Sequence, residues 1–223
     1  MKSIRYLFVL WHVAFVLTSC GGQIVGGSIK GEGEIEERSY EMEDFTGVGL
    51  GIPAEVTITK GSSNTIRIQA QPNILDNIKR KVKDGTLGLE FDRNVRKSLP
   101  IKVFLEMDQI ANLAIGGSGG ITVEDRFEDL DRLELAIGGS GSIALSGQGR
   151  RAEMSVAGSG NMNCPDLKVD RAEVSIAGSG DVTIHVVERL EVSIAGSGDV
   201  RYRGTPEVES SIVGSGDVRA LNN

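Results

Sequence analysis

The chain has 223 residues, of which 39% are hydrophobic, 4% aromatic and 25% charged, which is typical of folded domains rather than disordered chains. A formal net charge of −7 argues against a nucleic-acid partner, because contact with phosphates requires a basic face. Two Cys and two His exclude a disulfide framework and most zinc sites, and no cofactor is indicated.

The first twenty residues have the pattern of an export signal. A basic head, Met1–Arg5, precedes an apolar run over residues 6–17 that is shorter than the ~20 residues of a membrane-spanning helix. Leu17-Thr18-Ser19-Cys20 then resembles the bacterial lipobox, in which the signal is cut before a Cys that receives the lipid. We therefore predict a lipoprotein signal peptide over residues 1–19 and a membrane anchor at Cys20. The alternative is an ordinary secretory signal.

Residues 20–39 are predicted to form a flexible, lipid-anchored tether. Six Gly lie between residues 21 and 39, with few large apolar side chains. Such a segment cannot bury enough apolar surface to fold by itself.

Residues 40–109 are predicted to be an irregular β segment that caps the body. Strands are indicated over residues 54–59 and 65–70, a short helix over 72–80, a hairpin over 82–91 and a strand over 101–105. A repetitive β body needs such an end to protect its open strand edge.

Residues 110–223 contain a repeat marked by the tripeptide Gly-Ser-Gly. Its first glycine recurs six times with spacings of 22, 19, 20, 18 and 18 residues, at Gly117, Gly139, Gly158, Gly178, Gly196 and Gly214. A period near 20 residues indicates a solenoid or a similar array. Glycine suits a sharp corner between short strands because it tolerates positive φ.

Apolar residues alternate with polar or small ones around each tripeptide. The positions two, four and six before its first glycine, and four and six after it, are apolar in every repeat except at Ser210. This alternation predicts strands with one buried face. Either a parallel solenoid with one repeat per coil or an antiparallel meander with one hairpin per repeat fits it. The near-identity of successive repeats favours the solenoid.

Two columns of acidic residues follow from stacked coils. The first, five residues before each corner, contains Glu134, Glu153, Glu173, Glu191 and Glu209. Arg132, Arg151, Arg171 and Arg189 each precede one of these Glu by two residues, so the two sets share a face and are expected to neutralise one another. A ligand-binding charged stripe is the alternative.

The second column contains Asp181, Asp199 and Asp217, three residues after the corner. Stacked carboxylates ~4.8 Å apart could bind a cation, whereas the alternative is hydrogen bonding to backbone amides at the turn. Elsewhere, Cys164 occupies an inward position and His185 an outward one. No nucleophile or acid accompanies His185, so no catalytic residue is predicted.

Several segments together resemble the GIN domain, the head domain of auto-transporter adhesins. They are Phe45-Thr46-Gly47-Val48, Val56-Thr57-Ile58-Thr59-Lys60-Gly61, Pro72-Asn73-Ile74-Leu75-Asp76 and the repeated Ser-Ile-Ala-Gly-Ser-Gly-Asp-Val. The resemblance extends from about Glu37 to the C-terminus. It implies a right-handed parallel β-helix and an exported lipoprotein of the kind common in Bacteroidota, with an adhesive role.

The favoured hypothesis is therefore a non-enzymatic lipoprotein of the bacterial outer membrane, facing either side, that binds a glycan or a protein. An alternative is a structural protein that self-associates through strand edges of the final coil, near residues 218–223. A polysaccharide-active enzyme is less favoured, because spacings of 18–22 residues leave no room for long catalytic loops.

Overall fold

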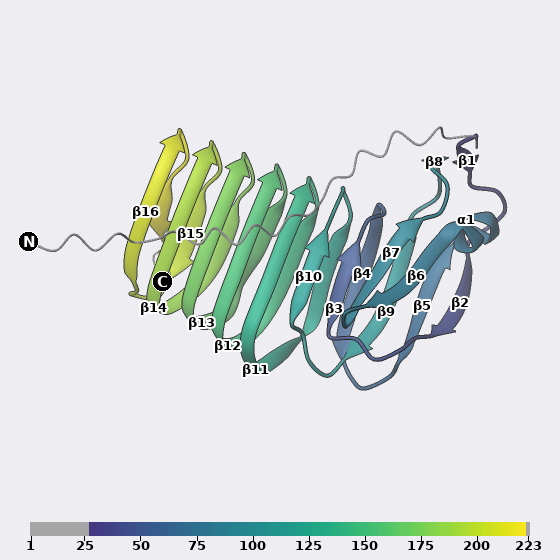
Figure 1. Cartoon of the computed structure of the whole chain (residues 1–223), viewed down its shortest axis with the longest axis horizontal. Helices are drawn as coiled ribbons and strands as arrows, with labels where there is room; N and C mark the ends of the chain where they lie inside the picture. The colour runs from purple at the N-terminus through teal and green to yellow at the C-terminus, as the bar shows by residue number, and fades with distance from the viewer. Residues whose placement is uncertain (1–26, 222–223) are drawn as a thin grey trace, which may run out of the picture.

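The computed structural model describes residues 27–221, so the predicted signal peptide, Cys20 and the first part of the predicted tether lie outside it. It is 70% strand and 3% helix, and its strands stack into a β-solenoid of about five turns (Figure 1). The predicted all-β solenoid is confirmed.

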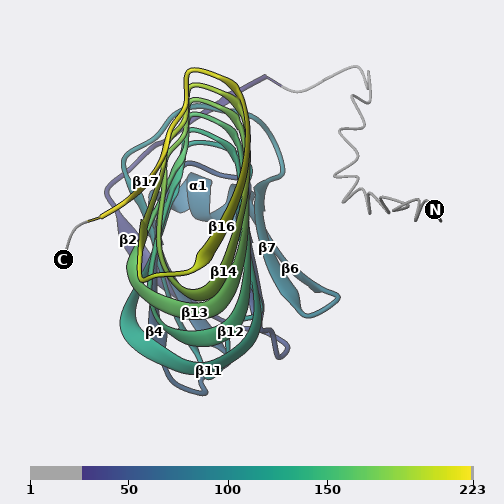
Figure 2. The ribbon, with the colours of Figure 1, turned by 90° about the vertical axis from the view of Figure 1, so that its left-hand side faces the viewer.

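Each Gly-Ser-Gly repeat forms one coil of the solenoid. The chain runs along one wall, turns at the corner and returns along the opposite wall (Figure 2). The strands of the coils are β10 (Asn112–Ile115), β11 (Gly120–Gly139), β12 (Ser142–Gly158), β13 (Asn161–Gly178), β14 (Val182–Gly196), β15 (Val200–Arg203), β16 (Glu207–Gly214) and β17 (Val218–Ala220).

The pairing within this array is parallel and follows the sequence repeat. Glu134 of β11 lies beside Glu153 of β12, and Gly139 lies beside Gly158. The same register continues from β12 to β13, β14 and β16. Because every pairing among β10–β17 is parallel, the antiparallel meander that the repeats also allowed is excluded.

The corners lie directly above one another. The Ser159 amide donates to the Gly139 carbonyl at 2.8 Å, and the Ser179 amide donates to the Gly158 carbonyl at 2.8 Å. Gly178 has a φ of +133°, and a Cβ there would overlap the Gly158 carbonyl oxygen. From Gly139 onward, the first position of the corner is therefore restricted to glycine by backbone conformation and by the coil beneath it.

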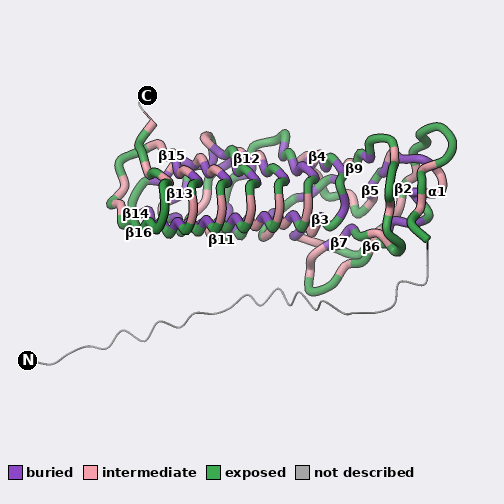
Figure 3. Tube along the Cα trace, turned by 90° about the horizontal axis from the view of Figure 1, so that it is seen from above, coloured by how far each residue is buried: buried purple, intermediate pink, exposed green. Residues whose placement is uncertain are grey.

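The interior is filled by the predicted apolar positions. Buried residues run along the whole length of the body (Figure 3), and Leu135, Ile137 and Val174 are each at most 2% exposed. Among the positions predicted to be apolar and buried, those that are not buried are Ala111 and residues of the last coil. Register shifts between Thr122 and Leu130 absorb the differing coil lengths at the bend opposite the corner.

The N-terminal half contains shorter strands and the single helix of the described chain. Its elements are β1 (Ile29–Lys30), β2 (Glu36–Glu41), β3 (Gly47–Leu50), β4 (Ala54–Lys60), β5 (Thr65–Ala70), α1 (Pro72–Asn77), β6 (Ile78–Lys83), β7 (Thr86–Phe91), β8 (Val95–Lys97) and β9 (Ile101–Met107). The β6–β7 hairpin projects from the side of the body (Figure 2), as the sequence predicted for residues 82–91.

Part of this half continues the solenoid out of sequence order. β3 and β4 pair in parallel with β10 and β11, and on their other side they pair with β7 and β9. The layer formed by β3 and β4 therefore lies between the later layer of β7 and β9 and the first Gly-Ser-Gly coil. The segment predicted to be irregular thus includes two layers of the same two walls.

Three details of the predicted N-terminal organisation need correction. The strands predicted over residues 54–59 and 65–70, on either side of residues 60–64, are present as β4 and β5, but β9 lies between them and pairs with both. The helix ends at Asn77 because Ile78 begins a strand paired with β7. The tether predicted over residues 20–39 is wrong for β1 and most of β2, which pair with β8 and β5. A free strand edge can bind a polar segment through its backbone, which composition does not reveal.

Two buried amides hold the cap together. The Gln71 side chain donates to the Gly33 carbonyl and accepts from the Leu99 amide. The Asn77 side chain donates to the Arg93 carbonyl at 2.8 Å and accepts from its amide at 3.0 Å. These are the two buried polar side chains within residues 27–221. They supply hydrogen bonds where no adjacent coil supplies them.

Candidate functional site

The Glu column forms on the wall that carries β10–β14 and β16. Glu134, Glu153, Glu173, Glu191 and Glu209 stand side by side in successive strands. The Arg column, Arg132, Arg151, Arg171 and Arg189, runs parallel to it and ends beside Glu207 of the last coil. We call these two columns together the Arg–Glu face.

Ion pairs connect the two columns across neighbouring coils. Arg132 lies 2.9 Å from Glu153, and Arg151 lies 3.8 Å from Glu173. Arg189 contacts Glu191 on its own strand at 2.7 Å and Glu209 on the next coil at 2.9 Å. The predicted mutual neutralisation is thus present in the geometry. Exposed pairs of this kind each contribute ~0–1 kcal/mol of stability.

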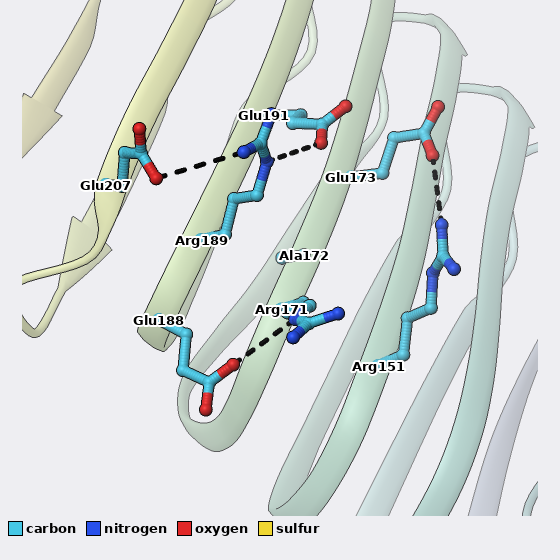
Figure 4. A pocket seen from close by; sticks show the side chains of 8 residues that line it. All are labelled: Arg151, Arg171, Ala172, Glu173, Glu188, Arg189, Glu191 and Glu207. Atoms are coloured by element: carbon cyan, nitrogen blue, oxygen red, sulfur yellow. Dashed lines mark hydrogen bonds and ion pairs between the residues drawn. The ribbon is translucent and has the colours of Figure 1, made fainter.

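The Arg–Glu face is hollowed into a shallow, open groove of about 490 Å³ (Figure 4). Arg171 points to Glu188 at the bend of the coil, at 3.2 Å, rather than to the Glu column. The hydrogen bond to Glu191, helped by the charge of Glu209, raises the pKa of Arg189 above its ordinary value. The groove is lined by Arg151, Arg171, Ala172, Glu173, Glu188, Arg189, Glu191 and Glu207.

The Asp column lies on the opposite wall and forms a backbone ladder. The Asp199 amide donates to Asp181 Oδ1 at 3.0 Å, and the Asp217 amide donates to Asp199 Oδ1 at 3.2 Å. Asn161 begins the ladder by accepting from the Asp181 amide at 3.1 Å. An amide oxygen thus takes the same place as a carboxylate oxygen, so the ladder needs an acceptor rather than a charge.

Arginines occupy the other oxygens of the Asp column. Arg201 lies 3.2 Å from Asp181 Oδ2 and 3.0 Å from Asp199 Oδ2, and Arg219 lies within 4.0 Å of Asp199 and Asp217. The guanidinium groups of Arg201 and Arg219 therefore reduce the repulsion between the stacked carboxylates, as a bound cation would. Within residues 27–221 no group of three or more His, Cys, Asp or Glu has the arrangement of a metal site.

Arg201 and Arg219 were not singled out by the sequence reasoning. Each follows an Asp of the column by two residues, and residues two apart on a strand share a face. The same spacing rule that connected Arg with Glu on the first wall would have found them.

Cys164 is buried and unreactive, whereas His185 is only partly buried. Burial raises the pKa of the Cys164 thiol to about 12, so it is protonated and inert at neutral pH. Partial burial, together with the positive charges of Lys168 and Arg203, lowers the pKa of His185.

The family assignment rests on most of the folded body. The model of the family described as "Putative auto-transporter adhesin, head GIN domain" matches residues 44–206. The chain belongs to this family. The match includes β3–β15 and most of the Arg–Glu face. No curated protein matches the chain.

Solved structures share the fold at low sequence identity. One described as a putative adhesin from Bacteroides fragilis has a TM-score of 0.71 and 23% identity, over 87% of this chain and 100% of the other. One described as a putative lipid binding protein from Parabacteroides distasonis has a TM-score of 0.56 and 22% identity, over 88% and 100%. One described as a putative adhesin from Parabacteroides merdae has a TM-score of 0.55 and 19% identity, over 88% of this chain and 100% of the other.

The family suggests a protein of the cell envelope or surface. In the described part of the chain, no helix has the length and apolar character needed to traverse a bilayer.

Proposed function

We propose that this chain is a non-catalytic binding module, anchored in the outer membrane by a lipid on Cys20, that contacts its ligand through the Arg–Glu face. The observation that carries the proposal is the repetition of one Arg and one Glu in successive coils along the same wall. Membership of an adhesin family supports the same role.

The shape of the Arg–Glu face favours an extended ligand over a small molecule. Pockets for small molecules are concave and bury most of the ligand surface. The groove over β12–β16 is instead open and charged. Neighbouring coils repeat its side chains every ~4.8 Å, so a polymer lying across the coils meets the same groups several times.

A glycan is the ligand class that this pattern fits best. Hydroxyl groups both donate and accept hydrogen bonds, while Arg only donates and ionised Glu only accepts. The alternation of Arg151, Glu153, Arg171 and Glu173 therefore offers complementary partners to a polyhydroxyl chain. A protein ligand is the second candidate.

A glycan array tests the contact surface. We would apply the chain lacking residues 1–20, which keeps every described element, and compare it with the triple variant Arg151→Ala, Arg171→Ala and Arg189→Ala. A matched control replaces Lys81, Lys83 and Arg96, which lie on the N-terminal half, by Ala. We expect the first variant to lose binding at least about tenfold and the control to retain it. Equal binding by both variants would refute this contact surface.

The same array addresses catalysis. Each glycan would be incubated with the protein, with and without calcium, and examined for new reducing ends or unsaturated products. We expect none. Any product that depends on the protein would reverse the non-catalytic assignment.

The lipid anchor requires a separate test on the full chain expressed in a Bacteroidota host. Mass spectrometry of the membrane-bound protein should find an N-terminus at Cys20 that carries acyl chains. In Cys20→Ser the signal should stay uncut, so the protein should carry neither acyl chains nor a new N-terminus at residue 20. Cleavage of this variant at the same site would contradict the lipobox. Protease treatment of intact cells then tells which side of the membrane the body faces.

A further inference from the structure

The two ends of the solenoid differ in the kind of strand that forms their outer edges. At the N-terminal end, the walls finish in antiparallel strands, β6 on β7 and β2 on β5, together with α1 (Figure 1). At the other end, β16 pairs only with β14, and β17 pairs only with β15. The outer backbone groups of β16 and β17 therefore have no strand partner within residues 27–221.

The last coil also leaves its apolar interior open. Ile212 is 39% exposed, whereas Ile194, at the same position one coil earlier, is 1% exposed. Val208 and Val218 are only half-buried, although their counterparts Leu190 and Val200 are fully buried. The end of the body is therefore an apolar strip bordered by two free strand edges.

The two edges of this end face carry different charges. On β16, Glu207 takes the place that arginine holds in the earlier coils, and Glu209 follows it. On the opposite wall, β17 carries Arg219, with Arg201 directly beneath it. Asp217 lies beside β17 but is 4.0 Å from Arg219 and is partly neutralised by it. Glu207 and Glu209 in turn contact Arg189 of the coil beneath, at 3.8 and 2.9 Å. The β16 edge therefore carries two partly neutralised acids, and the β17 edge carries one acid and one arginine.

We propose that a second copy of this chain binds this end face, C-terminal coil against C-terminal coil. A two-fold axis along the long direction of the coil exchanges the two walls (Figure 2). It sets β16 of each copy antiparallel to β17 of the other, which brings Glu207 and Glu209 of one copy toward the Arg219 side of the other and joins the two apolar strips.

The ends dictate a closed dimer instead of a filament. A head-to-tail contact would place the open coil against the antiparallel strands and α1 of the N-terminal end, which present no parallel coil edge. A contact in which both copies use the same patch closes after two subunits.

The size of the end face sets the expected strength. Eight residues of β16 span roughly 26 Å, and the two walls lie roughly 10 Å apart. The buried area is therefore below the roughly 1,200–2,000 Å² of stable complexes, so we expect dissociation in the micromolar range.

The test measures the mass of the full chain in detergent by sedimentation from about 5 to about 200 μM. We expect a monomer–dimer equilibrium that Ile212→Glu weakens at least about tenfold. Val187→Glu is the matched control, because Val187 is also 39% exposed but belongs to β14 of the preceding coil, whose edge is already paired with β15 and β16. It should leave the dimer unchanged. Circular dichroism establishes that both variants keep the β fold.

Crosslinking distinguishes the pairing of the edges. Chains with Ser211→Cys, mixed with chains carrying Arg219→Cys, should form a disulfide dimer, while Ser211→Cys alone should not. A monomer at the highest concentration, oligomers larger than a dimer, or a dimer unaffected by Ile212→Glu would each overturn the proposal. Efficient crosslinking of Ser211→Cys with itself would overturn the assigned pairing of β16 with β17.

Discussion

The coils between Gly139 and Gly196 and the N-terminal half build the same two walls by different means. In the coils, each backbone group finds its partner on an identical neighbour, and the side chains inside are apolar. In the N-terminal half, layers are stacked out of sequence order. The segments that connect them form backbone hydrogen bonds with the side-chain amides of Gln71 and Asn77. In the repeated coils, backbone N–H and C=O groups thus find hydrogen-bond partners without the help of buried polar side chains. In the N-terminal half, where the repetition is broken, buried side-chain amides supply them.

The largest expected effect tests how strictly the coils depend on identical neighbours. Gly178→Ala should lower the free energy of unfolding by about 2–4 kcal/mol, because φ is positive and the new Cβ meets the Gly158 carbonyl. Gly117 begins the first corner, where a Cβ would have nothing within 4 Å. Gly117→Ala should therefore cost less than about 1 kcal/mol. Urea denaturation measures both, and equal losses would contradict the stacking of the corners.

The next effect tests the side-chain supports of the N-terminal half. Asn77→Ala should cost about 1–3 kcal/mol, because it removes a buried amide that forms two part-buried hydrogen bonds to the Arg93 backbone. Asn73 is only half-buried, and it also bonds to two backbone groups, of Lys30 and Glu32, through solvent-exposed hydrogen bonds, so it serves as the control. Asn73→Ala should cost less than about 1 kcal/mol because water replaces its bonds. If both variants unfold at the same urea concentration, the buried hydrogen bonds of Asn77 do not stabilise the fold more than the exposed ones of Asn73.

A smaller effect separates acceptor from charge in the Asp column. Asp199→Ala removes the acceptor of the Asp217 amide and should cost about 1 kcal/mol. Asp199→Asn keeps an oxygen in that place and should cost less than about 0.5 kcal/mol, as Asn161 already illustrates. Thermal unfolding with and without calcium completes the test. Stabilisation by calcium that disappears in both variants would show that the column binds a cation.

The smallest effect concerns pH. Because the pKa of His185 in the fold lies below its ordinary value of ~6.5, the unfolded chain binds the proton more tightly. The stability that neutral His185 contributes is therefore present above pH ~6.5 and is lost as the pH falls below it. Between pH ~7.5 and ~5.5, the wild type should lose slightly more thermal stability than His185→Gln. An identical pH dependence of both proteins would refute this.

Much of the candidate site followed from spacing alone. Once Gly158 and Gly178 were aligned, the neighbours of Glu153 and Glu173 were determined, because a strand repeats its faces every two residues. Side-chain direction was harder to predict. Arg171 contacts Glu188 at the bend instead of the Glu column, since long exposed side chains choose among several carboxylates of similar energy.

By itself, the sequence determined the period, the apolar interior and the parallel columns of the C-terminal coils, because each repeat specifies the same local structure and stacks on its own copy. Only the tertiary structure decided that β3 lies between β7 and β10, that β4 lies between β9 and β11, that β2 pairs with β5, and that the last coil is left open. These features depend on backbone hydrogen bonds between segments far apart in the chain. Such bonds are nearly independent of side-chain identity, so no residue pattern records them.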